Sequence, residues 1–174
     1  MSAPEFWTDL YARGGDGWEL RQPAPGLVEF VERTPPPPGR IAVPGCGRGH
    51  DARFLARHGY GAVGFDFSPA AIEAARGLAR AFDGVWEYTC FCAIDPARRA
   101  EYVRAMAAIL RPGGWLLACF FPLRRRAAGP PFPVPPSEIR RRFTPAFRIE
   151  RAWTPRSVRL RLGQEWMVLF RKTC

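Results

Sequence analysis

The chain has 174 residues, of which 47% are hydrophobic, and its 26 basic and 16 acidic residues give a formal net charge of +10. This composition excludes a disordered chain, and the length suits one globular domain over residues 1–174, with an N-terminal segment at 1–38 and a core at 39–174. No apolar run approaches the roughly 20 residues of a membrane span, and the first residues lack the basic start and apolar stretch of a signal peptide.

Apolar periodicity and cap residues predict helices and strands that alternate along the chain. The predicted helices lie at residues 6–12, 26–33, 51–58, 68–80 and 95–110. The predicted strands lie directly before Gly45, up to Asp66, and at residues 84–88, 115–121, 147–153 and 165–171, with a turn at 111–114. This order predicts an α/β fold: a doubly wound, mostly parallel sheet with helices on both faces and an antiparallel C-terminal hairpin.

The most informative motif is a strand that runs into three alternating glycines, Gly45, Gly47 and Gly49, followed at once by a predicted helix. Asp66 ends the next strand, 17 residues after Gly49. Glycines let a backbone approach a ligand where a Cβ would clash, and a carboxylate at a strand tip can accept both ribose hydroxyls. The pattern therefore predicts a site for an adenosyl ligand; the alternative is a tight turn in an unrelated α/β protein.

The spacing of the glycines distinguishes between adenosyl ligands. A dinucleotide fingerprint requires a glycine at the position of His50, because the pyrophosphate lies on the helix N-terminus. The Gly-x-Gly-x-Gly pattern is instead similar to the S-adenosylmethionine loop of class I methyltransferases, which have a Rossmann-like fold.

Cysteines and charge bear on the compartment and the partners of the protein. The 5 cysteines are odd in number and contain no Cys-x-x-Cys pair, so we expect free thiols, no metal site and the reducing cytoplasm. Lys172 is the single lysine, and we interpret the arginine bias as that of a GC-rich proteome rather than as a phosphate-binding surface. We expect the arginine clusters at 124–126 and 140–142 on solvated faces, and a monomer without a nucleic-acid or membrane partner.

Short sequence blocks carry a family resemblance. They occur in one order at residues 6–7, 17–20, 23–25, 43–51, 64–68, 88–96, 111–114 and 129–132. With these blocks the sequence resembles the thiopurine methyltransferase superfamily, especially its bacterial members and the plant halide/thiol methyltransferases, over nearly its whole length. The resemblance implies a methyltransferase that uses S-adenosylmethionine, releases S-adenosylhomocysteine and acts on a small molecule.

The resemblance also implies which residues contact the cofactor. Trp7, Tyr11 and Trp18 fall where the family has an aromatic set that closes over the cofactor, and each aromatic face attracts a sulfonium cation by about 1–2 kcal/mol. The alternative is that these aromatics only attach the N-terminal segment to the core. The glycine loop would lie against the methionine moiety, and Asp66 would hold the ribose.

On the substrate side, the resemblance places Tyr88 between cofactor and substrate, at the end of the fourth strand of the family fold. Its alternative role is that of a half-buried tyrosine at a strand end. Arg161 matches a motif near the substrate mouth, where it could steer an anion, or it is a surface arginine of a strand. Phe132 belongs to a Gly-Pro-Pro-Phe loop that we expect in the substrate pocket.

Methyl transfer displaces a neutral leaving group, so the reaction needs no enzyme acid. A nucleophile that is already anionic, such as a thiolate, sulfide, halide, thiocyanate, thiopurine or a selenium or tellurium species, needs no base either, and catalysis then rests on alignment and desolvation. The chain fits this chemistry, because it has only 2 histidines and no Ser-His-Asp set.

The chain departs from the family between Ala79 and Asp83. Family members have a third strand and an acidic loop there, roughly two dozen residues more, and a parallel crossover needs at least about ten residues. Either this segment is absent from the protein or a stretch is missing from the sequence, and the second strand should then lie at a bare or unusually paired sheet edge.

Two other functions stay open on sequence alone. A nucleic-acid methyltransferase would use the same fold with a basic face, and a truncated, non-catalytic relative would no longer bind the cofactor well.

Overall fold

The computed structural model describes Glu5, Arg13 and residues 20–47, 49–65, 82–123 and 129–173. In these residues six strands form one sheet in the order β2-β1-β3-β4-β6-β5. The strands are β1 (Arg40–Pro44), β2 (Gly61–Phe65), β3 (Phe82–Tyr88), β4 (Leu110–Phe120), β5 (Phe147–Trp153) and β6 (Trp166–Lys172). The first four are parallel, and β6 is antiparallel to both β4 and β5. The predicted α/β sheet and its antiparallel C-terminal hairpin are confirmed.

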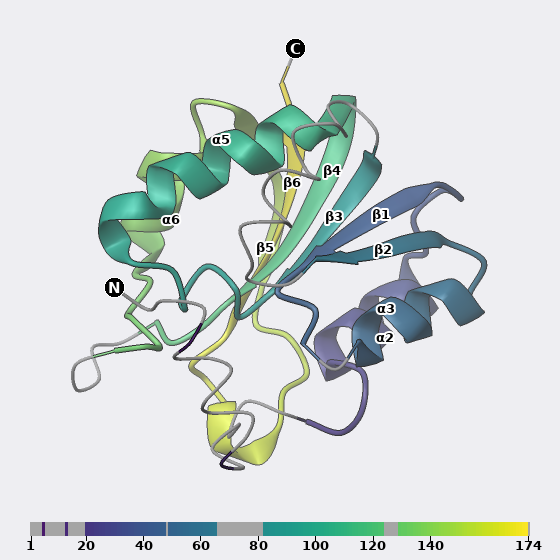
Figure 1. Ribbon diagram of the computed structural model, residues 1–174, viewed down its shortest axis with the longest axis horizontal. Helices are drawn as coiled ribbons and strands as arrows, with labels where there is room; N and C mark the ends of the chain where they lie inside the picture. The colour runs from purple at the N-terminus through teal and green to yellow at the C-terminus, as the bar shows by residue number, and fades with distance from the viewer. Residues whose placement is uncertain are drawn as a thin grey trace.

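Helices cover both faces of the sheet. They are α2 (Pro25–Arg33), α3 (His50–Arg57), α5 (Arg99–Ile109) and α6 (Pro136–Phe143), with short 3-10 turns η1 (Pro96–Arg98) and η2 (Arg159–Arg161). Figure 1 shows α5 and α6 on one side of the sheet and α2 and α3 on the other. Each pair of helices packs on its own hydrophobic core, so the molecule has three layers.

The central strands are apolar because both of their faces are covered. Ile41, Ala42 and Val43 of β1 are at most 3% exposed, and residues 114–120 of β4 are buried throughout. Near-continuous apolar runs of this kind are typical of parallel strands buried on both faces. The core therefore holds the carboxyl ends of β1, β3 and β4 in a fixed arrangement.

Several predicted elements are confirmed with small shifts in their bounds. The helices predicted at 26–33 and 51–58 are α2 and α3, and the side chain of Asp95 accepts a hydrogen bond from the Ala97 N–H at 2.9 Å at the start of η1. The turn predicted at 111–114 is wrong as a separate element, because Leu110 already pairs with Phe82 and the run forms a register shift within β4. The helix α6 was not among the predicted elements.

The predicted seam between Ala79 and Asp83 stays a prediction, because residues 66–81 lie outside the described residues. Within the described part of the chain, β2 is an edge strand that pairs with β1 alone. The predicted helices at 6–12 and 68–80 also lie outside it. Among the helices that the structure describes, none has both the length and the apolar character to cross a membrane.

Candidate active site

The candidate active site lies where the carboxyl ends of neighbouring parallel strands meet. β3 lies between β1 and β4 in the sheet and is parallel to both. Residues that follow these strands therefore come together at one edge, which is where open α/β sheets bind ligands. The predicted glycine loop follows β1, Tyr88 ends β3, and Phe121 follows β4.

The glycine loop has a backbone that other residues rarely adopt. The φ angles of Gly45, Gly47 and Gly49 are +66°, +48° and +76°. A Cβ added at Gly45 would lie 2.9 Å from the Cβ of Cys90, so only glycine fits between the loops that follow β1 and β3. Because Gly45 and Gly47 are also exposed, the loop presents bare backbone at the sheet edge, which fits a cofactor that must approach it closely.

The end of β2 is joined to this loop. The Cys46 N–H donates to the Phe65 carbonyl at 3.0 Å, so the last residue of β2 lies against the glycine loop. Asp66, the predicted ribose-binding residue, follows Phe65 directly in the sequence but lies outside the described residues, as do Trp7, Tyr11 and Trp18. Their predicted contacts with the cofactor stay predictions.

Asp51 holds the helix that follows the glycine loop in place, a role that the sequence did not predict. It lies in the first turn of α3, where its Oδ1 accepts the Ala24 N–H and its Oδ2 accepts the indole N–H of Trp86, both at 2.7 Å. One carboxylate thus ties the helix after the loop to the segment before α2 and to β3. An acidic residue in the first turn of a helix can be recognised in a sequence, but its bond to Trp86, 35 residues away, cannot.

Tyr88 is held by two charged residues on its hydroxyl side. The guanidinium of Arg161 donates to the Tyr88 hydroxyl at 2.9 Å, and this hydroxyl donates to Glu165 Oε1 at 3.2 Å. The Tyr88 ring stacks on Trp86, with centroids 5.8 Å apart and ring planes 10° apart. Asp51, Trp86 and Tyr88 therefore form a continuous path from α3 to Arg161.

The charges of this cluster balance each other. Arg161 and Glu165 are 7% and 3% exposed, and their charged groups lie 3.6 Å apart. The guanidinium also lies 4.8 Å from the ring centroid of Phe121 and 5.4 Å from that of Tyr88. Burial raises the pKa of Tyr88, so its phenol is neutral at physiological pH. Glu165, four residues after Arg161, was not among the predicted site residues.

Phe132 belongs to the segment 129–134, which borders the loop after β3. The Phe132 N–H donates to the Cys92 carbonyl at 2.7 Å, and the Val134 N–H donates to the Pro122 carbonyl at 2.9 Å. A Cβ added at Gly129 would lie 2.7 Å from Cδ1 of the Phe132 ring, so the segment folds back on itself. The structure thus places Phe132 beside the loop that contacts Gly45.

Both histidines lie in α3 or directly after it. The Nδ1 atoms of His50 and His58 lie 3.3 Å from the Arg53 guanidinium and 2.9 Å from the Phe54 carbonyl, respectively, all within or next to α3. In the described ranges, no group of three or more His, Cys, Asp or Glu side chains could hold a metal ion.

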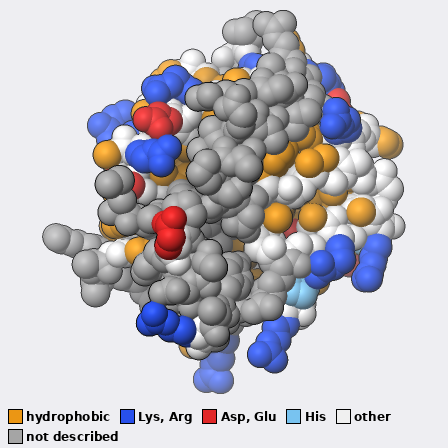
Figure 2. All heavy atoms as spheres, viewed as in Figure 1, with side chains coloured by type: hydrophobic (Ala, Val, Ile, Leu, Met, Phe, Trp, Pro, Cys, Tyr) orange, Lys and Arg blue, Asp and Glu red, His pale blue; other side chains and the backbone are white. Residues whose placement is uncertain are grey.

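The basic side chains that Figure 2 shows do not form one surface. On that face the arginine and lysine side chains of the described residues lie in separate groups near the rim, some beside acidic side chains. The predicted solvated position is confirmed for Arg140 and Arg141 of α6, but it is wrong for Arg142, whose side chain is 22% exposed and pairs with Glu138. Residues 124–126 lie outside the described residues.

Comparison with known proteins identifies the family. The family model described as thiopurine S-methyltransferase matches residues 2–80 and 75–165, two stretches that overlap close to the predicted seam. A probable thiol methyltransferase 2 of Arabidopsis thaliana is 32% identical over 161 residues, which cover 80% of this chain and 71% of that protein. Thiocyanate methyltransferase 1 of Brassica oleracea is 29% identical over 192 aligned residues, covering 95% of this chain and 84% of that enzyme.

The last alignment is longer than the 174 residues of the chain, so the Brassica enzyme contains residues without a counterpart here. Among solved structures, a similar one is the Burkholderia thailandensis 1,6-didemethyltoxoflavin-N1-methyltransferase with bound 1,6-didemethyltoxoflavin and S-adenosylhomocysteine. Its TM-score is 0.73 at 18% identity, covering 98% of this chain and 87% of that one, which shows the shared fold. By its glycine loop, its fold and the family match, the chain belongs to the thiopurine S-methyltransferase family of methyltransferases.

Proposed function

We propose that the protein transfers the methyl group of S-adenosylmethionine to a small, soft nucleophile such as a thiol, sulfide, thiopurine, thiocyanate, halide, or a selenium or tellurium species. The observation that carries this proposal is the position of Tyr88, which Arg161 and Glu165 hold one strand away from a loop of positive-φ glycines in a member of this family. The thiol and thiocyanate methyltransferases among its relatives support the same substrate class.

The described residues fit the cofactor. The bare backbone of Gly45, Gly47 and Gly49 would receive its methionine end. Asp66, which follows β2 in the sequence and lies outside the described residues, is proposed to accept the ribose hydroxyls. When bound, S-adenosylmethionine supplies an activated methyl group on a cationic sulfur. We further propose that residues 1–38 cover the cofactor, with Trp7, Tyr11 and Trp18 toward the sulfonium.

The residues around Tyr88 orient the reaction and do not exchange protons with it. Tyr88 is a neutral phenol because burial raises its pKa, and its hydroxyl is already engaged by Arg161 and Glu165. An anionic nucleophile attacks without a base, so the contribution of the site is alignment and the exclusion of water.

The balance between Arg161 and Glu165 favours soft nucleophiles over strongly hydrated anions. A free arginine would attract any anion, but here a buried carboxylate lies 3.6 Å from the guanidinium and offsets its charge. The aromatic rings of Phe121 and Tyr88, both near the Arg161 guanidinium, add polarisable surface, which suits sulfur and iodide. Phe132 would complete the pocket from the segment 129–134.

We further propose that the protein works as a monomer in the reducing cytoplasm. Cys92 and Cys119 are buried and form no disulfide in the structure, which fits such a compartment.

The test is the pH dependence of methyl transfer to two nucleophiles. With a simple alkyl thiol, the rate should rise with pH up to the pKa of the thiol, about 8.5, because the thiolate attacks. With iodide, which does not titrate, the rate should stay nearly flat over the same range. A bell-shaped profile for both would require an enzyme acid and base, and would contradict the proposal. Methylation of tRNA or DNA without any methylation of thiols or halides would favour a nucleic-acid methyltransferase instead.

A further inference from the structure

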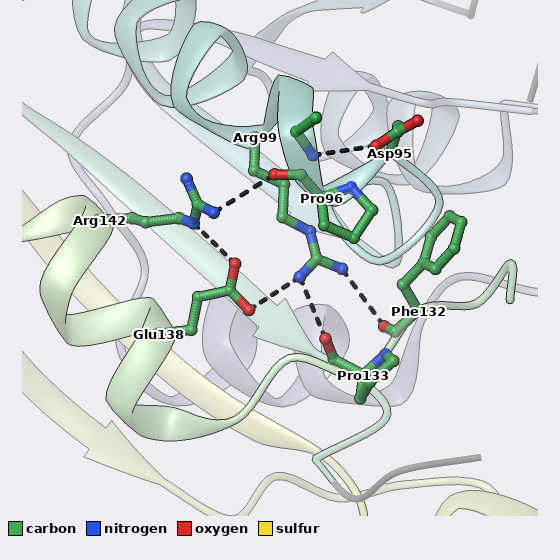
Figure 3. A network of polar contacts seen from close by, with 8 residues as sticks. Asp95, Pro96, Arg99, Phe132, Pro133, Glu138 and Arg142 are labelled. Atoms are coloured by element: carbon green, nitrogen blue, oxygen red, sulfur yellow. Dashed lines mark hydrogen bonds and ion pairs between the residues drawn. The ribbon is translucent and has the colours of Figure 1, made fainter. Parts of the chain in front are cut away.

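A buried arginine lies behind the segment 129–134. Arg99, the first residue of α5, is 1% exposed, whereas its neighbour Arg98 has a side chain that is 52% exposed. Figure 3 shows the Arg99 side chain pointing from α5 toward Phe132 and Pro133. Nothing in the sequence distinguishes Arg99 from the arginine beside it.

The guanidinium of Arg99 bonds two consecutive carbonyls of this segment. Its Nη1 donates to the Pro133 carbonyl at 3.1 Å and its Nη2 to the Phe132 carbonyl at 3.4 Å. The same Nη1 donates to Glu138 Oε2 at 2.9 Å, and the guanidinium lies 4.9 Å from the centroid of the Phe91 ring. One planar group thus fixes the backbone on which Phe132 is carried.

Glu138 keeps Arg99 in this orientation. Its Oε2 pairs with Arg99, while its Oε1 accepts the Nε–H of Arg142 at 2.6 Å (Figure 3). Arg142 donates in turn to the Pro96 carbonyl at 3.3 Å, and it makes no bond to the segment 129–134 among the described residues. The carboxylate therefore connects α6 to Arg99 through one oxygen and to the start of η1 through the other.

Stability alone does not account for this arginine. A buried ion pair is often no better for stability than apolar residues of similar volume, because desolvation offsets the attraction between the charges. The Nε of Arg99 has no hydrogen-bond partner among the described residues, which adds to the cost of burying it. What an apolar residue could not supply is a planar fork with donors for two adjacent carbonyls.

We propose that Arg99 is a positioning residue for substrate binding, which sets the place of Phe132 in the pocket. This inference rests on the proposed function, because it takes Phe132 as part of the substrate site. Arg99 acts through the backbone of Phe132 and Pro133 and does not touch the glycine loop that would hold the cofactor. Loss of the fork should therefore weaken substrate binding and leave cofactor binding unchanged.

The test compares Arg99→Lys with Arg142→Lys as its matched control. Both variants keep a positive charge beside Glu138, but only Arg99→Lys removes a guanidinium that donates hydrogen bonds to the segment 129–134. For Arg99→Lys we expect KM for thiophenol and for a short alkyl thiol to rise about tenfold or more, because charge-assisted bonds are lost. We expect kcat to change less, and the affinity for S-adenosylhomocysteine to stay within about twofold of wild type. Arg142→Lys should leave both constants within about twofold.

Hydrogen exchange gives a second readout that does not depend on turnover. The amides of Phe132 and Val134 should exchange about tenfold faster in Arg99→Lys and at the wild-type rate in Arg142→Lys. If Arg99→Lys does not fold, Glu138→Gln serves in its place, because it leaves the guanidinium intact but removes the charge that orients it. For Glu138→Gln we expect the same rise in KM and the same faster amide exchange.

The outcomes separate this inference from the function on which it rests. A wild-type protein that methylates none of the thiols or halides contradicts the proposed function and the substrate role of Arg99 with it. An active wild type whose folded Arg99→Lys variant has an unchanged KM overturns this inference alone. Equal losses in substrate and S-adenosylhomocysteine affinity would also overturn it, because they would indicate general loosening of the fold.

Discussion

Glu87 should make the stability of the protein fall as pH rises toward neutrality. Its side chain lies in β3 beside Tyr88 and is 1% exposed. Oε1 accepts the Phe91 N–H at 2.9 Å, but Oε2 has no hydrogen-bond partner among the described residues. Burial raises the pKa of Glu87 from its ordinary 4.5 to about 7, against the opposing effect of the backbone bonds from Phe91 and Cys90.

The direction of the effect follows from proton linkage. Between pH 4.5 and about 7 the folded protein holds a proton on Glu87 that the unfolded chain has lost. The contribution of this group to stability is therefore fully present below pH 4.5 and is lost as pH rises through about 7. A shift of this size corresponds to about 3 kcal/mol, since one pKa unit is worth about 1.4 kcal/mol. Glu87→Gln keeps an oxygen for the Phe91 N–H and does not ionise, so it should remove this loss.

The measurement is urea denaturation of wild type, Glu87→Gln and the exposed control Glu101→Gln from about pH 5 to about pH 8. The stability of Glu87→Gln relative to wild type should grow by about 3 kcal/mol over this range, whereas Glu101→Gln should follow wild type. Parallel curves for wild type and Glu87→Gln would contradict this prediction, because they would mean that Glu87 titrates alike in the folded and unfolded states.

Three further substitutions probe the site. Gly45→Ala should weaken the binding of S-adenosylhomocysteine more than tenfold by calorimetry. It should also lower the free energy of unfolding by more than the about 1–2 kcal/mol expected from backbone strain alone. In the control Gly113→Ala the residue has a similar φ but open space around it, so this variant should lose stability from strain without a loss of affinity. Asp66→Ala should weaken the same ligand by about 2–3 kcal/mol, because it removes a charge-assisted pair of bonds; unchanged affinity in a folded variant would exclude the ribose contact. Glu165→Gln leaves the charge of Arg161 unbalanced, so KM for thiocyanate should fall about fivefold at low ionic strength and less in salt; an unchanged KM would mean that Glu165 does not offset Arg161.

Local patterns were enough to predict most of the fold. Short stretches of consecutive residues contain the signals for the apolar strand β1, the glycines after it, and the ends of α3 and η1. Each of these elements is confirmed. The error at 111–114 has a physical reason: Gly113 does have a turn-like φ of +69°, but Leu110 before it already pairs with β3. A turn signal indicates backbone shape, and it does not exclude pairing with a neighbouring strand.

The polar contacts of the site could not be predicted in the same way. Asp51 reaches Trp86 across 35 residues, and Arg99 reaches Glu138 across 39, so neither pair leaves a periodic signal in the sequence. The charge balance between Arg161 and Glu165 was closer to being predictable, because their separation of four residues is short. Long-range polar contacts of this kind depend on the packing of several elements, which sequence patterns do not specify.

The most direct test of the proposed methyl transfer is product analysis by mass spectrometry after incubation of the wild-type protein with S-adenosylmethionine and a single alkyl thiol. We expect one methyl thioether for every S-adenosylhomocysteine formed, and methyl iodide in the same ratio when iodide replaces the thiol. S-adenosylmethionine that remains unchanged with every soft nucleophile tested would contradict the central claim that this protein is a small-molecule methyltransferase.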